Sequence, residues 1–166
     1  MSASKLPAIG ILANLDPEDV KALASYGTFE TATPGTVVIE QGISHAKLFL
    51  VIDGELNACR NDQGHDVLLG QVCAGEWMGE VSLFDPSETL CFVVAATDCR
   101  YWVITRDNLE EFLTNHSPAG MLLLIGLSTT LSRRIREVTS KLAALHPRNM
   151  WALSRRIREV PFKLAE

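Results

Sequence analysis

The sequence lacks any uninterrupted hydrophobic run of the roughly 18 residues that a membrane-spanning helix needs. Its first 20 residues also lack the longer hydrophobic region and the small-residue cleavage site of a secretory signal. The four cysteines form no C-x-x-C pair, so we expect reduced thiols and no bound metal. These absences predict a cytoplasmic protein without a membrane span.

Motifs of common catalytic sites are lacking as well. The sequence contains neither G-x-S-x-G nor an H-x-H pair, and its histidines are scattered at His45, His65, His116 and His146. A metalloenzyme of the cupin kind, the alternative with catalytic activity, needs several histidines and a carboxylate around one ion. We therefore expect no catalytic residue, no metal and no cofactor, and we interpret the histidines as solvated.

Positive charge is scarce in most of the chain. Residues 1–130 hold 6 Lys and Arg against 17 Asp and Glu, whereas residues 131–166 hold 9 against 3. No Lys or Arg lies between Arg60 and Arg100. An acidic body does not fit a general nucleic-acid binder, although the basic tail could meet an anionic surface. We do not expect a nucleic acid or a membrane as partner.

Three kinds of segment follow one another along the chain. Residues 14–27 predict a helix, with Asp16 as its cap, Pro17 in its first turn and Gly27 at its end. Short hydrophobic runs with glycine-containing turns then fill residues 28–106, and a helical pattern follows. The sequence predicts a mostly β fold: an antiparallel jelly-roll β-barrel flanked by an N-terminal helix and a long C-terminal dimerisation helix. We assign residues 1–145 to this domain and residues 146–166 to a basic tail.

A narrow hydrophobic stripe runs along the last predicted helix. From Met121 its members recur at intervals of three and four residues, with Ser128 filling one step, and they end before Pro147. Packing of the helix on its own barrel is one explanation, and the seam of a homodimer is the other. We favour the homodimer, whose seam consists of Leu124, Leu131, Ile135, Val138, Leu142 and Leu145.

The tail repeats part of this helix. Residues 131–144, LSRRIREVTSKLAA, recur as LSRRIREVPFKLAE at 153–166, identical at 11 of 14 positions. Pro161 should end or kink a helix in the second copy. We interpret the repeated arginines as a solvated helix face.

The segments PGTVVIEQG, KLFLVIDGELNA, GQVCAGEWMGEVSLF and VVAA carry an ordered series of glycines that ends at Gly79, followed by Glu80. With this series, residues 8–145 resemble the cyclic-nucleotide-binding domain of catabolite-activator-type regulators, kinase regulatory subunits and cyclic-nucleotide-gated channels. The resemblance implies a site for cyclic AMP or cyclic GMP in which the glutamate binds the ribose and an arginine meets the phosphate. A short helix beginning at Gly79 would also aim backbone N–H groups at an anion. The implied ligand-binding residues are Gly79, Glu80, Val81, Ser82, Thr89, Leu90, Thr139 and Ser140.

The sequence departs from the family at the phosphate contact. Thr89, six residues before Ala95, stands where the family has its arginine. A threonine donates one neutral hydrogen bond and has no charge. We therefore expect a non-catalytic, dimeric regulatory module with an unidentified protein partner and with degenerate or altered nucleotide binding. The alternative is a functional sensor in which Arg100, Lys47 or a residue of a second chain replaces the arginine.

Overall fold

The structure is a computed structural model that describes residues 5–145. The chain forms two compact units, Met1–Leu127 and Ser128–Glu166. The tail predicted at 146–166 lies outside the described residues, and the boundary after residue 145 stays a prediction.

The first unit begins with two short helices, η1 (Gly10–Asn14) and α1 (Pro17–Ala24). Eight strands follow: β1 (Thr28–Ala32), β2 (Val37–Ile39), β3 (Lys47–Asp53), β4 (Glu55–Asp62), β5 (His65–Cys73), β6 (Trp77–Met78), β7 (Phe92–Ala95) and β8 (Cys99–Thr105). The helix α2 (Glu80–Phe84) lies between β6 and β7, and α3 (Arg106–Asn115) follows β8. The last helix, α4 (Ser117–Leu145), continues from the first unit into the second.

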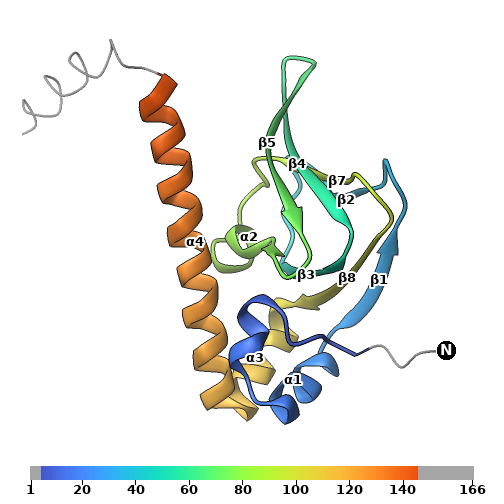
Figure 1. The fold of residues 1–166 in the computed structure, drawn as a ribbon, viewed down its shortest axis with the longest axis vertical. Coiled ribbons are helices and arrows are strands. Elements are labelled where there is room, and N and C mark those ends of the chain that lie inside the picture. Colours follow the sequence, from blue (N-terminus) through green and yellow to red (C-terminus); the bar gives the residue numbers. More distant parts are fainter. Residues whose placement is uncertain (1–4, 146–166) are drawn as a thin grey trace, which may run out of the picture. The chain divides into compact units, whose positions relative to one another are not determined.

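The strands form two antiparallel sheets of four strands each (Figure 1). Their orders are β1-β8-β3-β6 and β2-β7-β4-β5, so strands distant in sequence lie side by side in both sheets. The predicted fold class is confirmed in its antiparallel sheets, its N-terminal helix and its long C-terminal helix. The sheets are open rather than closed into one barrel.

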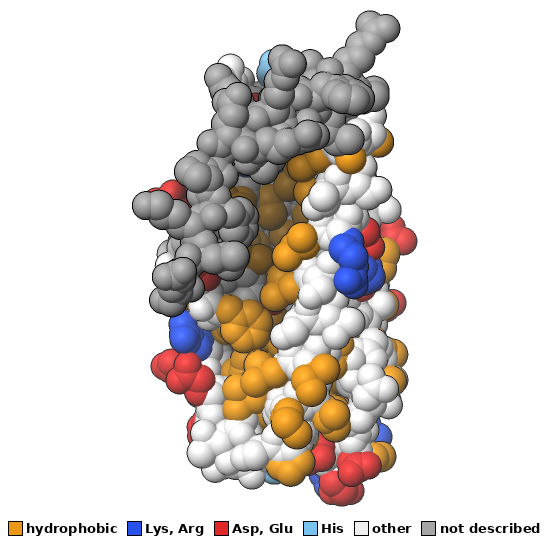
Figure 2. Space-filling model, turned by 90° about the vertical axis from the view of Figure 1, so that its left-hand side faces the viewer, with side chains coloured by type: hydrophobic (Ala, Val, Ile, Leu, Met, Phe, Trp, Pro, Cys, Tyr) orange, Lys and Arg blue, Asp and Glu red, His pale blue; other side chains and the backbone are white. Residues whose placement is uncertain are grey.

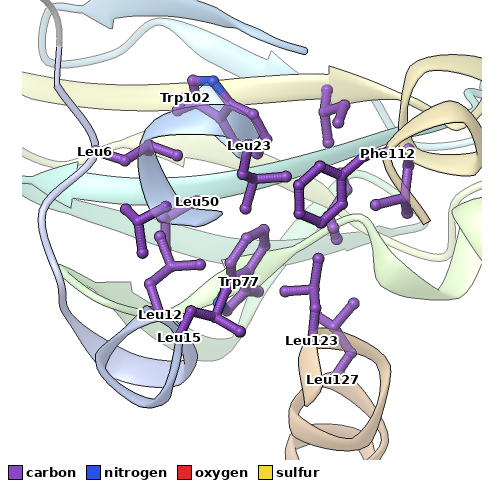
Figure 3. Close-up of a cluster of buried hydrophobic side chains, with 14 of the residues drawn as sticks. Leu6, Leu12, Leu15, Leu23, Leu50, Trp77, Trp102, Phe112, Leu123 and Leu127 are labelled. Atoms are coloured by element: carbon purple, nitrogen blue, oxygen red, sulfur yellow. The ribbon is translucent and has the colours of Figure 1, made fainter. Parts of the chain in front are cut away.

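Two hydrophobic clusters hold the first unit together, one on each face of β3. Phe49 and Val51 pack into a cluster between the two sheets. Leu48 and Leu50 point to the other face, where they join Trp102, Phe112 and the helices (Figure 3). Because both of its faces are covered, β3 is a continuous hydrophobic run instead of an alternating one.

The N-terminal helix is shorter than predicted. Asp16 occupies the N-cap position, but its side chain makes no capping hydrogen bond, and the helix ends at Ala24 rather than at Gly27. A Cβ atom at Gly27 would lie 2.4 Å from the carbonyl oxygen of Val103 and 2.5 Å from the ring of Trp102. Gly27 is thus required for close packing against β8, and its interpretation as the helix end is wrong.

The first turns of α4 belong to the core, because Leu123 and Leu127 are fully buried. Other hydrophobic side chains of these turns, including Met121 and Ile125, are more than half exposed. Figure 2 shows hydrophobic side chains gathered on the side of the first unit where α4 begins. Among the described residues, no helix is both long enough and hydrophobic enough to cross a membrane.

Candidate functional site

The turn that leads into α2 is built around Gly79. Its φ of +86° lies in the left-handed region, which glycine adopts without strain. A Cβ atom there would lie 2.5 Å from the carbonyl oxygen of Lys47 and 3.1 Å from Cε1 of His45. Backbone conformation and lack of space both require glycine at this position, which fixes where α2 begins.

The helix α2 is anchored in the core by its neighbours. Trp77, two residues before Gly79, is 1% exposed and meets Trp102 edge to face with ring centroids 6.4 Å apart. Leu83 is buried as well, and its backbone N–H donates to the carbonyl of Gly79 at 3.0 Å. Val81 lies on the opposite, exposed side of the helix. The inner side of α2 therefore packs into the core, and its outer side is exposed.

Glu80 and Ser82 are the buried polar side chains of the described part of the chain, with 3% and 5% of their surface exposed. Removing a carboxylate from water costs free energy unless polar groups meet it. The acid that the resemblance assigns to a ribose hydroxyl is thus turned into the protein and is not solvated.

The Thr89 loop is tied to the segment before β3. The hydroxyl of Thr89 donates a hydrogen bond to the carbonyl oxygen of Glu40. The carbonyl oxygen of Thr89 accepts from the N–H of Gly42 at 2.9 Å, and Glu88 forms an isolated antiparallel bridge with Ser44. The neutral donor that stands in the place of the family's arginine is therefore already used within the protein. The next residue, Leu90, is 70% exposed.

The two basic residues predicted as substitutes for that arginine occupy different elements. Lys47 begins β3 and contacts the Gly79 turn through its carbonyl oxygen. Arg100 is exposed on β8, paired with Thr31 of β1, whereas the Thr89 loop leads into β7 of the other sheet. Of the two, Lys47 is the one whose backbone adjoins the candidate site.

His45 is a site residue that sequence reasoning missed. Its ring packs edge to face on Phe49, with centroids 5.7 Å apart, and its Nδ1 accepts from the backbone N–H of Lys47 at 3.3 Å. Burial, followed by the charge of Lys47, lowers the pKa of His45 below its ordinary value. The neutral ring then carries its proton on Nε2, a buried atom that has no hydrogen-bond partner.

The interpretation of His45 as a solvated residue is therefore wrong. The sequence places it at a turn, which suggests exposure, but the turn folds over Phe49 and the Gly79 backbone. No local pattern in the sequence could have indicated this, because Gly79 lies 34 positions away along the chain.

The remaining predicted residues lie on α4. Leu124, in the first unit, is partly buried. In the second unit, Thr139 and Ser140 are exposed. Ile135, Val138 and Leu142, members of the predicted seam, are 66%, 55% and 57% exposed. Leu131 is partly buried, and Leu145 is the last residue of the helix.

The structure offers no metal site in residues 5–145. No three His, Cys, Asp or Glu side chains gather there so that they could hold one ion. Cys59, Cys73 and Cys99 are free thiols. His146, the fourth histidine weighed for a metalloenzyme, lies outside the described residues.

Comparison with known proteins agrees with this geometry. Residues 29–116 match the family model described as cyclic nucleotide-binding domain. The CRP-like protein Clp of Xanthomonas campestris is 29% identical over 113 residues, which cover 66% of this chain and 49% of Clp. The chain thus spans about half the length of the curated relatives that it matches.

Solved structures share the fold. The catabolite activator protein of Thermus thermophilus has a TM-score of 0.72 at 27% identity, covering 82% of this chain and 62% of its own. The Clp structure from Xanthomonas campestris, described as a c-di-GMP responsive regulator, has a TM-score of 0.72 at 20% identity, covering 89% and 73%. A regulatory subunit of a cAMP-independent protein kinase A from Trypanosoma brucei, a triple mutant that includes a threonine-to-arginine change and holds cAMP, has a TM-score of 0.65 at 21% identity, covering 81% and 47%.

Proposed function

Because this chain belongs to the cyclic nucleotide-binding domain family, we propose that it is a non-catalytic regulatory module that works as a dimer and binds cyclic AMP and cyclic GMP weakly or not at all. The observation that carries this proposal is the Thr89 contact. Its hydroxyl is bonded to the Glu40 carbonyl, and the chain supplies no Lys or Arg between residues 60 and 100.

The missing charge has a large expected effect on affinity. Truncating one partner of a buried, hydrogen-bonded charge pair costs roughly 2–5 kcal/mol. On the affinity scale, this loss weakens binding by about 30-fold to several thousand-fold. The acidic residues Asp85 and Glu88 of the same segment oppose an anion further. A site that would bind in the micromolar range with arginine then binds in the millimolar range.

The Trypanosoma brucei relative supports this reasoning. Its cAMP-bound form carries three substitutions, one of which replaces a threonine by an arginine. We expect a gain in affinity from Thr89→Arg, which adds a guanidinium group where the family has one.

Calorimetric titration of three forms tests the proposal: the unmodified chain, Thr89→Arg, and Thr89→Gln as an uncharged control of similar length. Thr89→Arg should bind cyclic AMP or cyclic GMP at least about 30-fold more tightly than the other two. A dissociation constant below about 10 µM for the unmodified chain would contradict the proposal and favour the functional sensor, in which Arg100, Lys47 or a residue of a second chain replaces the arginine. Cyclic di-GMP, the ligand class named for Clp, is titrated in parallel to detect an altered ligand.

The dimer is the second part of the proposal. Ile135, Val138 and Leu142 form an exposed stripe at intervals of three and four residues, the spacing of a two-helix seam. Ile135→Glu should therefore weaken self-association in sedimentation experiments. Ser140→Glu adds the same charge on the face of the helix opposite the stripe and should leave self-association unchanged. Equal effects of the two substitutions would contradict a seam at this place.

A further inference from the structure

The exposed stripe of α4 occurs twice in the sequence. Residues 131–138 and 153–160 are identical, and the second copy lies outside the described residues. Four hydrophobic positions of the predicted seam have a duplicate in the tail: Leu131, Ile135, Val138 and Leu142 recur as Leu153, Ile157, Val160 and Leu164. The tail thus carries the same hydrophobic pattern as the surface that a second chain would use.

We propose that residues 153–164 compete with a second chain for the stripe Ile135–Val138–Leu142, so that the tail limits dimerisation. This inference rests on the dimer seam of the proposed function and assigns its regulation to the chain itself. The occupant of the stripe in the monomer is the second copy, folded back on the first.

The spacing of the two copies fits such a fold-back. Residues 146–152 connect them, and seven residues lie within the usual length of a connection between antiparallel helices. A proline kinks or breaks a helix, so Pro147 in this connection disfavours a straight continuation of α4.

The register of an antiparallel return also agrees. Asn149 lies in the middle of the connection. For each seam residue from Ile135 to Leu145, the second copy has a hydrophobic residue at the same sequence separation from Asn149, to within one residue. The resulting pairs before Pro161 are Leu145 with Leu153, Leu142 with Ile157 and Val138 with Val160, whereas Leu164, the counterpart of Ile135, follows the proline. Because the stripe repeats at three and four residues in both directions, an antiparallel return would bring each hydrophobic side chain before Pro161 to another one.

Pro161 explains why the second copy would compete for the stripe instead of lengthening the dimer seam. Pro161 stands where the first copy has Thr139, and a proline removes a backbone N–H and disfavours a helix around it. The sequence of the second copy therefore has the lower helix propensity of the two. A tethered segment nevertheless acts at an effective concentration on the order of millimolar, which lets a weak internal contact compete with a second chain at micromolar concentration.

Charge predicts the salt dependence of this contact. Both copies are basic, with Arg133, Arg134 and Arg136 in the first repeated as Arg155, Arg156 and Arg158 in the second. Their repulsion is screened by salt, so the fold-back should become stronger as ionic strength rises. A tail that binds nucleic acid would show the opposite trend, since that binding weakens with salt.

The duplication supplies a matched pair of variants for the full chain, Ile135→Glu and Ile157→Glu, which make the same change in the same local sequence. Sedimentation velocity measures the dimer dissociation constant of each. We expect Ile157→Glu to tighten the dimer at least about tenfold, because it releases the stripe, and Ile135→Glu to weaken the dimer. If the unmodified chain dimerises and Ile157→Glu leaves that dimer unchanged or weakens it, the inference is overturned.

Hydrogen exchange separates failure of this inference from failure of the dimer. At concentrations where all forms are monomeric, peptides containing the unique pair Thr139–Ser140 report on the first copy alone. Ile157→Glu should make these peptides exchange at least about tenfold faster, as expected when a covering contact is lost. If no form dimerises but exchange accelerates, the seam proposal fails and the fold-back stands. If exchange is unchanged, the fold-back is refuted whatever the dimer does.

Discussion

The hydroxyl of Thr89 donates its hydrogen bond to the backbone carbonyl of Glu40, a residue 49 positions earlier in the chain. This bond and the one from the Gly42 N–H to the Thr89 carbonyl join two loops that the sheets themselves do not pair. A residue expected at a ligand contact thus has a structural role.

Thr89→Val removes this bond while keeping the shape of the side chain. We expect the free energy of unfolding to fall by about 0.5–1.5 kcal/mol, the usual net contribution of one hydrogen bond. Urea denaturation followed by circular dichroism measures the change. Thr114→Val is the control, because the hydroxyl of Thr114 bonds within its own helix to the Glu110 carbonyl and ties no loops together. A larger loss in the control would show that the loop contact contributes little.

The cost of the close contact at Gly79, at the start of α2, can be measured by comparison with Gly64, which has open space around it. Gly79 and Gly64 have nearly the same φ, +86° and +88°, but only at Gly79 would a Cβ atom meet the protein, 2.5 Å from the Lys47 carbonyl. Gly64→Ala should cost about 1–2 kcal/mol of stability, the strain of a left-handed alanine. Gly79→Ala should cost about 1–3 kcal/mol more, because the Lys47 backbone has to move. Thermal and urea unfolding measure both values, and equal losses would refute the close contact.

His45 should make stability depend on pH. Burial and the charge of Lys47 hold its pKa in the folded protein below the value in the unfolded chain, about 6.5. The unfolded chain therefore binds a proton first as pH falls. The stabilisation from the neutral ring is complete above about pH 6.5 and is lost progressively below it.

His45→Gln should accordingly flatten the fall in stability between pH 7.5 and 5, which urea unfolding at several pH values measures. His65→Gln, a change of an exposed histidine at the start of β5, is the control and should leave the profile unchanged. A profile of His45→Gln parallel to that of the unmodified chain would refute the neutral, partly buried state of His45.

Sequence reasoning located most strands because their hydrophobic runs are bounded by glycine turns. The runs at residues 47–52 and 100–105 became β3 and β8, each covered on both faces. The two-residue strand β6 could not be found in this way, since Trp77 and Met78 are a strand only by pairing with Leu50 and Phe49 of β3.

The site was predictable at Gly79 and less so around it. The positive φ and the crowded surroundings of Gly79 require a glycine at this position. Such a requirement can be recognised in the sequence, because this glycine belongs to an ordered series of glycines. The contacts of His45 and Thr89 depend on which loops meet in three dimensions. Residues 40 and 89, or 45 and 79, are brought together by the sheets and not by any local pattern.

Gly126 of α4 packs against Ile11 of η1. Replacing Gly126 by alanine has two opposite effects of comparable size on the free energy of unfolding. Alanine in a helix is favoured over glycine by about 1 kcal/mol. A Cβ atom on Gly126 would, however, lie 2.4 Å from Cγ2 and 3.2 Å from Cβ of Ile11, so the branched side chain cannot simply swing away. Overpacking of this kind costs about 1–3 kcal/mol, and Gly126→Ala should therefore be neutral to destabilising by about 2 kcal/mol.

In an Ile11→Ala background the obstacle is gone, and the same change should stabilise the protein by about 1 kcal/mol. Urea unfolding of the four forms gives the coupling between the two sites. If Gly126→Ala stabilised both backgrounds equally, η1 would not pack on α4 at this point.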